Sequence, residues 1–336
     1  MSDKLLVTGG AGFIGANFVH RLVRERPHTR VIVVDALTYA GNLENLKGLE
    51  GRFTFVRADI CNQAEMQRVC EAERVSGIIN FAAESHVDRS ILGPRVFIDT
   101  NVGGTLSLLE VARALKLGRF LQVSTDEVYG SLGATGLFTE ETPLAANSPY
   151  SASKASADLL ARAYHHTFGL DVVTTRCSNN YGAYQFPEKL IPLMIANALE
   201  DKALPVYGDG KNVRDWLHVE DHCEALLAVF ERGRAGEVYN IGGHNEWANI
   251  DIVKLVLSLL QKPESLIRYV TDRPGHDRRY AIDAGKMARE LGWKPRWNFA
   301  DGLKATVAWY LEHREWSRNV LNGEYQKYYA AQYGAG

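Results

Sequence analysis

Cysteine is scarce in this sequence, and the few cysteines present form no Cys-x-x-Cys pair. The four are Cys61, Cys70, Cys177 and Cys223. Such wide spacing fits neither the disulfide framework of a small secreted domain nor a cysteine metal site. We therefore expect reduced thiols and a cytoplasmic location.

Long apolar runs and an excess of one charge are also missing. No run reaches about 18 apolar residues, the length that a membrane-spanning helix needs. The formal net charge of −2 lacks the basic footprint of a nucleic-acid-binding protein. The chain passes from Met1-Ser2-Asp3-Lys4 directly into an apolar segment, so we expect no signal peptide. With 46% apolar and 23% charged residues over 336 positions, the composition favours a globular enzyme with one large domain or two closely packed ones.

A glycine-rich turn stands near the N-terminus. Residues 4–8 predict a short strand, and the sequence Gly-Gly-Ala-Gly-Phe-Ile-Gly follows at positions 9–15. A helical segment comes next, with Ile14, Phe18 and Leu22 on one face. In such a strand-turn-helix unit the glycines let the backbone approach a pyrophosphate, and the helix N-terminus attracts its charge. The segment therefore predicts a dinucleotide site.

An acidic residue at the end of the second predicted strand indicates which dinucleotide binds. Residues 31–34 are apolar and end at Asp35, 20 positions after Gly15. An acidic residue at this spacing binds the hydroxyls of the adenosine ribose. Its carboxylate would repel a 2′-phosphate, and no Arg or Lys follows at 36–38. The pattern favours NAD over NADP.

Apolar strands alternate with helical segments through the first half of the chain. Further strands are predicted at 53–56, 77–81, 120–123, 172–176 and 238–241, and long helices at 97–115, 152–168 and 299–313. The alternation predicts an α/β fold with a Rossmann-like, doubly wound parallel sheet. We expect an NAD-binding domain of residues 1–182, to which roughly 216–243 return. A smaller, mixed α/β C-terminal lobe of 183–215 and 244–336 would bind the substrate. Its last helix carries Leu303, Val307 and Leu311 on one stripe.

The segment between residues 124 and 154 carries the side chains best suited to chemistry. Thr125, Asp126 and Glu127 follow a predicted strand, so they should lie at the carboxyl edge of the sheet, where open α/β sheets bind ligands. Tyr150 and Lys154 are four residues apart at a predicted helix start and share one face. A nearby ammonium favours the tyrosinate, so we expect Lys154 to lower the pKa of Tyr150 and make it a base. Taken alone, the Asp-Glu pair is also typical of an exposed turn, and the Tyr-Lys pair of a helix surface. The catalytic interpretation is favoured because both occur in a chain that carries a dinucleotide motif.

Two histidines invite a test for metal binding. His218 and His222 are four residues apart, but Val219 stands where a helical zinc protease has glutamate. His218 is also expected to precede the helix. We therefore expect no metal.

Together these motifs resemble the extended short-chain dehydrogenase/reductase superfamily, and within it the dTDP-glucose 4,6-dehydratase family of deoxysugar (rhamnose-type) biosynthesis. The resemblance covers nearly the whole chain and is most specific in Ser-Thr-Asp-Glu-Val-Tyr-Gly at 124–130. Related nucleotide-sugar epimerases have a serine-rich segment there without the Asp-Glu pair. The chain departs from the family in a segment, 131–146, that is shorter than in some members, and in Ala183, where proline is common. The resemblance implies a homodimer.

The resemblance also implies a role for each candidate residue. Thr125 and Tyr150 would hold the sugar 4-hydroxyl, Lys154 would orient the nicotinamide ribose, Asp126 would be the acid and Glu127 the base of water elimination. The residues expected at NAD are Gly9, Gly12, Phe13, Ile14, Gly15, Asp35, Ala36, Leu37, Thr38, Asp59, Ile60, Phe81, Ala82, Ala83, Thr100, Tyr150, Lys154 and Asn180. Those expected at the nucleotide sugar, dTDP-glucose, are Ser85, Thr125, Asn179, Lys189, Leu190, Pro205, Tyr207, Arg214, Asn249, Arg273 and His276, of which Lys189, Arg214, Arg273 and His276 are candidate cations for the diphosphate.

Three other functions stay open at this point. A nucleotide-sugar 4-epimerase would use Tyr150 and Lys154 but not the adjacent carboxyl pair. A 4,6-dehydratase acting on UDP-glucose would use the same residues on a different nucleotide. A non-catalytic NAD-binding regulator would need only the glycine turn and Asp35.

Overall fold

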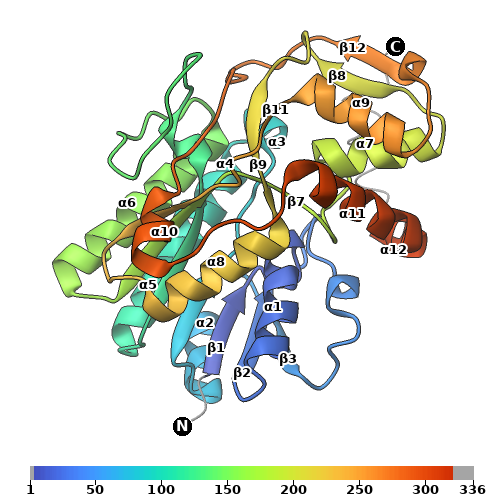
Figure 1. Ribbon diagram of the computed structural model, residues 1–336. Helices are drawn as coiled ribbons and strands as arrows, with labels where there is room; N and C mark the ends of the chain where they lie inside the picture. The colour runs from blue at the N-terminus through green and yellow to red at the C-terminus, as the bar shows by residue number, and fades with distance from the viewer. Residues whose placement is uncertain (1–3, 321–336) are drawn as a thin grey trace.

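The computed structural model describes residues 4–320, and its centre is a seven-stranded parallel sheet with helices on both faces (Figure 1). The strand order is β10-β6-β5-β4-β1-β2-β3. The strands are β1 (Lys4–Thr8), β2 (Arg30–Asp35), β3 (Phe53–Arg57), β4 (Gly77–Asn80), β5 (Phe120–Thr125), β6 (Val172–Cys177) and β10 (Val238–Ile241). This is the doubly wound, Rossmann-like α/β fold that the alternating pattern predicted.

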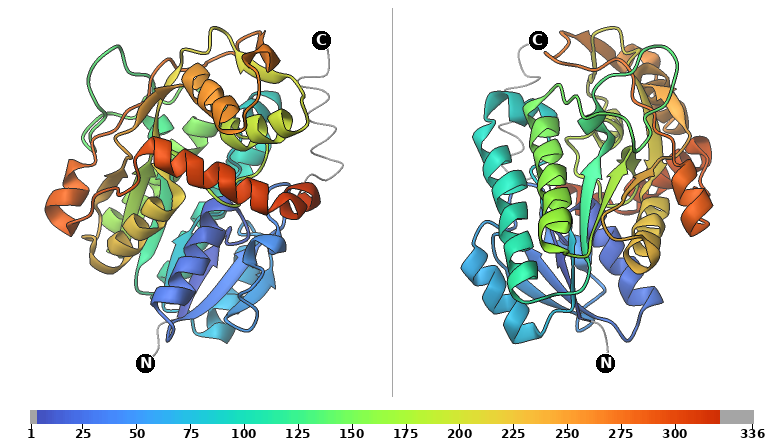
Figure 2. Two further views of the ribbon diagram at one scale, coloured as in Figure 1. Left: turned by 45° about the vertical axis from the view of Figure 1, so that its right-hand side comes forward. Right: turned by 90° about the vertical axis from the view of Figure 1, so that its left-hand side faces the viewer.

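The central strands are apolar along their length because both faces of the sheet are covered. Leu5 and Val7 of β1 face the helices α1 (Phe13–Glu25) and α8 (Val219–Arg232), whereas Leu6 faces the opposite side. That second face is covered by α2 (Gln63–Glu73), α5 (Thr105–Ala114) and α6 (Pro149–Phe168), as the right-hand view of Figure 2 shows. Parallel sheets are normally covered by helices on both faces, which explains the continuous apolar strands. We call this unit the large lobe.

Two helices of the large lobe differ from their predicted form. The expected helix at 97–115 consists of α4 (Arg95–Phe97), a π-helical segment (Ile98–Gly104) and α5. The wider π-helical turns contain Thr100, and such segments are frequent at functional sites. Helix α6 begins at Pro149, before the predicted Ala152, because the Ser148 side chain accepts a hydrogen bond from the Ser151 N–H and caps the helix. Tyr150 therefore lies in the first turn.

A small lobe packs above the carboxyl edge of the sheet in Figure 1. It contains the sheet β11-β9-β7 and the pair β12-β8, built from β7 (Asn179–Tyr181), β8 (Leu204–Tyr207), β9 (Val213–His218), β11 (Glu246–Ala248) and β12 (Ile267–Val270). Its helices are α7 (Leu190–Leu199), α9 (Asn249–Leu259), α11 (Phe299–Glu312) and α12 (Arg314–Val320). In α11, Leu303 and Val307 of the predicted stripe are buried, whereas Leu311 is 38% exposed and Tyr310 is buried next to it.

The two lobes have separate apolar cores. Helix α8 and strand β10 pack on the large lobe. Helix α10 (Gly285–Leu291) also packs on the large lobe, through Met287, outside the proposed boundaries. Helix α3 (Val87–Leu92) follows the loop after β4.

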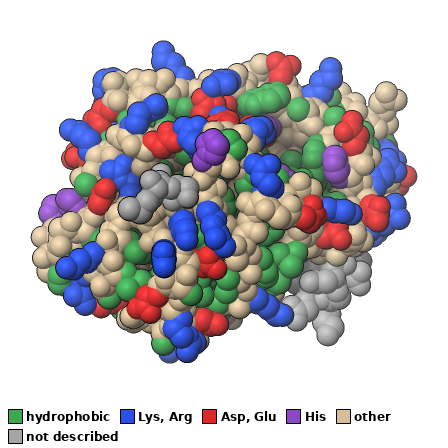
Figure 3. All heavy atoms as spheres, turned by 90° about the horizontal axis from the view of Figure 1, so that it is seen from below, with side chains coloured by type: hydrophobic (Ala, Val, Ile, Leu, Met, Phe, Trp, Pro, Cys, Tyr) green, Lys and Arg blue, Asp and Glu red, His purple; other side chains and the backbone are tan. Residues whose placement is uncertain are grey.

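The described residues contain no membrane-spanning helix, and one face of the molecule shows mixed charge. No helix within residues 4–320 is long and apolar enough to cross a bilayer. On the face seen in Figure 3, basic and acidic side chains are interspersed, in line with the net charge of −2.

Candidate active site

The site is a cleft with two compartments at the carboxyl ends of the central strands. The first is a cavity of about 320 Å³ that lies against the ends of β1, β2, β4, β5 and β6. The second, of about 170 Å³, lies toward the small lobe. The two cavities share the lining residues Glu127, Asn179, Asn180, Gln185, Glu188 and Lys189. A long ligand can therefore extend from one lobe to the other.

The glycine turn forms one wall of the first cavity. Gly9 has a φ of +65°, a conformation that side chains disfavour, and a Cβ on Gly15 would collide with the Gly9 carbonyl oxygen. Helix α1 begins after Gly12 without a side-chain cap, so its first N–H groups are available to an anion. The Asp35 carboxylate accepts hydrogen bonds from the Ala11 N–H at 3.0 Å and the Leu37 N–H at 2.8 Å. Because three of the four residues at 9–12 are glycines, the backbone of this turn can lie close to the pyrophosphate of a dinucleotide.

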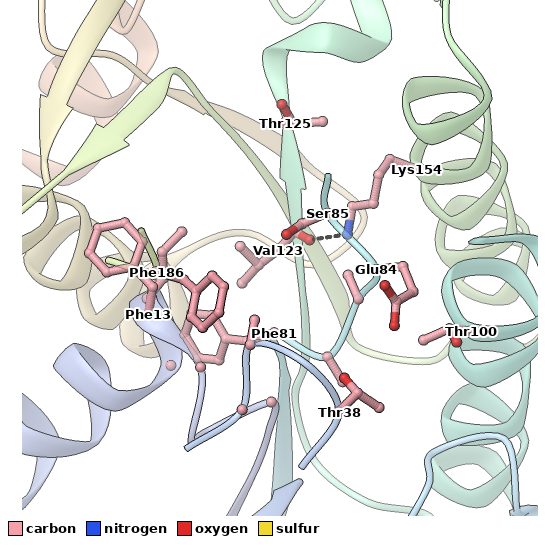
Figure 4. A pocket seen from close by; sticks show the side chains of 18 of the residues that line it. Phe13, Thr38, Phe81, Glu84, Ser85, Thr100, Val123, Thr125, Lys154 and Phe186 are labelled. Carbon is pink, nitrogen blue, oxygen red and sulfur yellow. Dashed lines mark hydrogen bonds between the residues drawn. The ribbon is translucent and has the colours of Figure 1, made fainter. Parts of the chain in front are cut away.

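The residues proposed for NAD are brought together, with one exception. All of them except Leu37 line the first cavity. Leu37 packs against the apolar core of the large lobe, and only its N–H takes part, through Asp35. Figure 4 shows Phe13, Phe81, Thr38 and Thr100 around this space. The wall also includes residues that the sequence did not indicate: Val34, Tyr39, Ala40, Gly41, Ala58, Glu84, Val123, Cys177, Ser178, Gln185, Phe186 and Glu188.

The Tyr-Lys pair lies at the base of the cleft, but its electrostatics differ from the prediction. Lys154 Nζ donates a 2.8 Å hydrogen bond to the Val123 carbonyl (Figure 4). Tyr150 is hydrogen-bonded to Thr125, and burial, followed by the Glu127 charge, raises the pKa of Tyr150 well above its ordinary value. The prediction that Lys154 lowers this pKa is wrong. Tyr150 is a neutral phenol at pH 7, suited to hydrogen bonding with a hydroxyl group.

The adjacent carboxyl groups lie on a short 3₁₀ helix, Asp126–Tyr129, directly after β5. Burial raises the pKa of Asp126 well above its usual range, and the charges of Glu127 and Asp215 raise it further. Burial also raises the pKa of Glu127, but three cations oppose this rise: Arg273, Arg214 and Lys189. The pKa values of both groups are thus raised, but three cations oppose the rise at Glu127 and only one of them, Arg214, opposes it at Asp126, so Glu127 is the more readily ionised of the two. Two carboxyl groups in such unlike environments can act as acid and base.

Three cationic side chains, those of Lys189, Arg214 and Arg273, line the second cavity, and neighbouring residues hold the two guanidinium groups in place. The Arg214 guanidinium lies over the Tyr280 ring, 4.3 Å from its centroid, and donates to the Asp277 carbonyl at 2.9 Å. Arg273 Nη1 donates to Asp88 Oδ1 at 2.8 Å, and Asp88 Oδ2 accepts from the Tyr207 hydroxyl at 3.0 Å. These bonds position guanidinium groups that match the geometry of phosphate oxygens.

His276 does not supply the charge expected of it. Burial and the neighbouring Arg273 lower the pKa of His276 to about 4, so the imidazole is neutral at pH 7. Its Nδ1 lies 2.6 Å from Asp272 Oδ1. The prediction of a fourth cation is wrong, and His276 can act only through hydrogen bonds.

The other residues proposed for the nucleotide sugar also meet in the cleft. Ser85 and Thr125 line the first cavity, and Asn179, Lys189, Leu190, Pro205, Tyr207, Arg214, Asn249, Arg273 and His276 line the second. Sequence reasoning missed Glu188, which lines both cavities and whose pKa burial raises to about 7. His222 was considered only as a metal candidate, and its contact with the site was not foreseen: its Nδ1 lies 2.8 Å from Asn180 Oδ1 and orients that amide. No local motif marks either residue.

The histidines tested as metal ligands have other partners. His218 caps α8 by accepting a hydrogen bond from the Glu220 N–H, and buried His222 contacts Asn180. Between residues 4 and 320, no group of three His, Cys, Asp or Glu side chains is placed to hold a metal ion.

Comparison with known proteins gives full-length matches. The family model described as GDP-mannose 4,6 dehydratase matches residues 6–306. A dTDP-glucose 4,6-dehydratase of Xanthomonas campestris pv. campestris (strain B100) is 57% identical over 341 residues, which cover 96% of this chain and 97% of the relative. The crystal structure of dTDP-glucose 4,6-dehydratase from Bacillus anthracis in complex with NAD has 54% identity and a TM-score of 0.89, covering 95% of this chain and 100% of that one. The enzyme of the same name from Streptomyces venezuelae, also solved with NAD bound, has 53% identity and a TM-score of 0.91, covering 94% and 99%.

These matches extend over both lobes and both cavities, so they are not limited to a shared cofactor domain. The sheet, the glycine turn and the carboxyl pair all lie within the matched residues. The chain therefore belongs to the dTDP-glucose 4,6-dehydratases of the GDP-mannose 4,6 dehydratase family.

Proposed function

We propose that the protein converts dTDP-glucose into dTDP-4-keto-6-deoxyglucose and water, with NAD held in the first cavity and the nucleotide of the sugar in the second. One observation carries the proposal: a buried Tyr-Lys pair and two carboxyl groups in unlike charge environments line the first cavity together, and one of them, Glu127, also lines the second. An oxidation pair and an acid-base pair would thus act on the same sugar ring.

The chemistry requires both pairs. The C5 proton of a hexose is hardly acidic until C4 is a ketone, which makes that proton alpha to a carbonyl. Bound NAD would accept the hydride that leaves C4, and its reduced form would return that hydride to C6. Thr125 and Tyr150 hold the 4-hydroxyl, and Lys154 orients the ribose next to the nicotinamide. Glu127 removes the C5 proton, and Asp126 protonates the departing 6-hydroxyl.

The path of hydrogen tests this function. Sugar deuterated at C4 should give product that carries the deuterium at C6, and reaction in heavy water should label C5. Free NADH should not accumulate, because the borrowed hydride is returned before release. Mass spectrometry and NMR of the product measure both labels. Deuterium that remains at C4 of an epimerised sugar would instead support a 4-epimerase.

The nucleotide preference is tested with two substrates side by side. We expect dTDP-glucose to be dehydrated faster than UDP-glucose, because relatives with up to 57% identity carry the dTDP-glucose name. The 4-keto-6-deoxy product absorbs strongly in alkali, which provides the assay. A faster reaction with UDP-glucose would assign a different dehydratase function to the same site.

The proposal includes a homodimer formed through the helices on one face of the large lobe. Several apolar side chains of these helices are exposed: Val96, Ile98, Leu106 and Leu159, the last at 58%. Two copies of α5 and α6 could bury them in a four-helix bundle about a two-fold axis. Light scattering at micromolar concentration should give the mass of two chains, and Leu159→Asp should shift it toward one.

Leu137→Asp is the matched control. Leu137 is 45% exposed but lies in the loop between β5 and α6, so its replacement should leave the dimer intact. A wild-type mass of one chain would rule out the dimer.

A cytoplasmic location is also part of the proposal, supported by the four free thiols.

A further inference from the structure

The last described helix, α12, reaches the cofactor edge of the large lobe. Its Trp316 is nearly buried, and Nε1 donates a 2.7 Å hydrogen bond to Asn45 Oδ1, 271 positions earlier in the chain. The indole packs against Trp309 and Tyr184, with ring centroids 5.1 and 5.9 Å away. Figure 1 and the left view of Figure 2 show α12 beside the segment that follows β2. The bond therefore ties the core of the small lobe to the large lobe.

Asn45 is also hydrogen-bonded to the glycine turn. Its Nδ2 donates to the Ala11 carbonyl at 2.8 Å, and the same carbonyl accepts from the Asn42 N–H at 3.0 Å. Ala11 lies in the middle of the turn, and its own N–H is bonded to Asp35. A chain of hydrogen bonds thus runs from Trp316 through Asn45 and Ala11 to the aspartate proposed for the adenosine ribose.

The segment held by Asn45 also forms the outer wall of the first cavity. Tyr39, Ala40 and Gly41 line this cavity directly before Asn42. Tyr39 and Ala40 pack against the same apolar core that contains Trp316. This segment and the glycine turn therefore both line the space that a dinucleotide would occupy, and separating them would widen it.

We propose that Trp316 is a positioning residue that retains NAD by holding this wall and the glycine turn together through Asn45. The inference rests on the proposed function, in which the cofactor must stay bound between the two hydride transfers. Asn45 is only 2% exposed, so loss of the indole N–H would leave a buried oxygen without its donor. An unsatisfied buried acceptor favours opening of the segment.

The rate of NAD release tests the inference. Protein loaded with radiolabelled NAD is mixed with excess unlabelled NAD, and the bound label is followed by filtration. Trp316→Phe should release NAD about tenfold faster than wild type, the size expected for one buried hydrogen bond. With excess NAD present, kcat should stay near wild type, because Trp316 does not line either cavity.

Trp293→Phe is the matched control. Trp293 is also a buried indole, but its Nε1 has no hydrogen-bond partner among residues 4–320. The control loses the same atoms without losing a bond, so its NAD release should match wild type. Equal rates for wild type and Trp316→Phe would overturn the inference, as would equal acceleration by both tryptophan variants.

A second variant keeps the test decisive if Trp316→Phe folds poorly. Asn45→Ala should accelerate release at least as much, and combining it with Trp316→Phe should add little, because both changes break the same connection. Full additivity would contradict the relay. Wild-type protein that retains no NAD would instead refute the proposed function, so the two failures are distinguishable.

Discussion

Replacing Glu127 with Gln is expected to slow dehydration by about 10²- to 10⁴-fold while leaving oxidation at C4 possible, because only the base for the C5 proton is lost. Glutamine keeps the size of the side chain but cannot accept that proton. The carboxylate of Glu127 faces Arg273, Arg214 and Lys189, which favour its ionised form. The variant should therefore reduce its bound NAD in a single turnover and then stop. The bound cofactor should then show the absorbance of NADH.

Glu141→Gln provides the control for this experiment. Glu141 is exposed in the loop before α6, so the same Glu-to-Gln change there should leave the turnover rate at the wild-type value. Stopped-flow absorbance measures the reduction, and the alkaline absorbance of the keto sugar measures the product. Near-native dehydration by Glu127→Gln would show that another group is the base.

Replacing Arg176 with Met is expected to destabilise the fold by about 3–5 kcal/mol, because it leaves a buried carboxylate without its partner. Arg176 Nε donates to Asp158 Oδ2 at 2.9 Å, and Nη1 donates to the Tyr129 hydroxyl at 3.0 Å. Tyr129 in turn donates to Asn240 Oδ1 at 2.8 Å. This network connects α6, which carries Tyr150 and Lys154, to the short helix of the carboxyl pair.

Denaturant unfolding followed by circular dichroism measures this change. Arg26 and Glu231 form an ion pair at 2.6 Å that is partly exposed, so Arg26→Met should cost at most about 1 kcal/mol. Adding Asp158→Leu to Arg176→Met should restore part of the lost stability, because it removes the carboxylate that the single change leaves without its arginine. A cost for Arg176→Met as small as for Arg26→Met would mean that water reaches the Asp158 carboxylate.

The parts of the site that were predictable are those with a local pattern. The glycine turn, Asp35 and the Tyr150–Lys154 spacing are defined by neighbours in the sequence, and the apolar strands indicated which polar residues stand at the sheet edge. The structure brings these residues to one cleft.

The parts that were missed depend on residues far apart in the chain. Asp88 supports Arg273 across 185 positions, and Asn45 meets Trp316 across 271. Glu188 lines both cavities and His222 contacts Asn180 from behind the cleft wall, and neither has a motif that points to this role. The pKa of Tyr150 was predicted wrongly because spacing indicates that Lys154 is near but says nothing about burial or about the Val123 carbonyl.

The path of the chain between the lobes limits how this enzyme can be re-engineered. The chain leaves the large sheet after β6, returns in α8 and β10, leaves again at β11, and packs on the large lobe once more in α10 before α11. Neither lobe is one continuous piece of sequence. Exchanging the small lobe for that of another nucleotide-sugar enzyme would need several simultaneous splices, and the one after β6 falls among residues that line the cleft. New substrate preferences are therefore more accessible through point changes in the second cavity than through recombination of lobes.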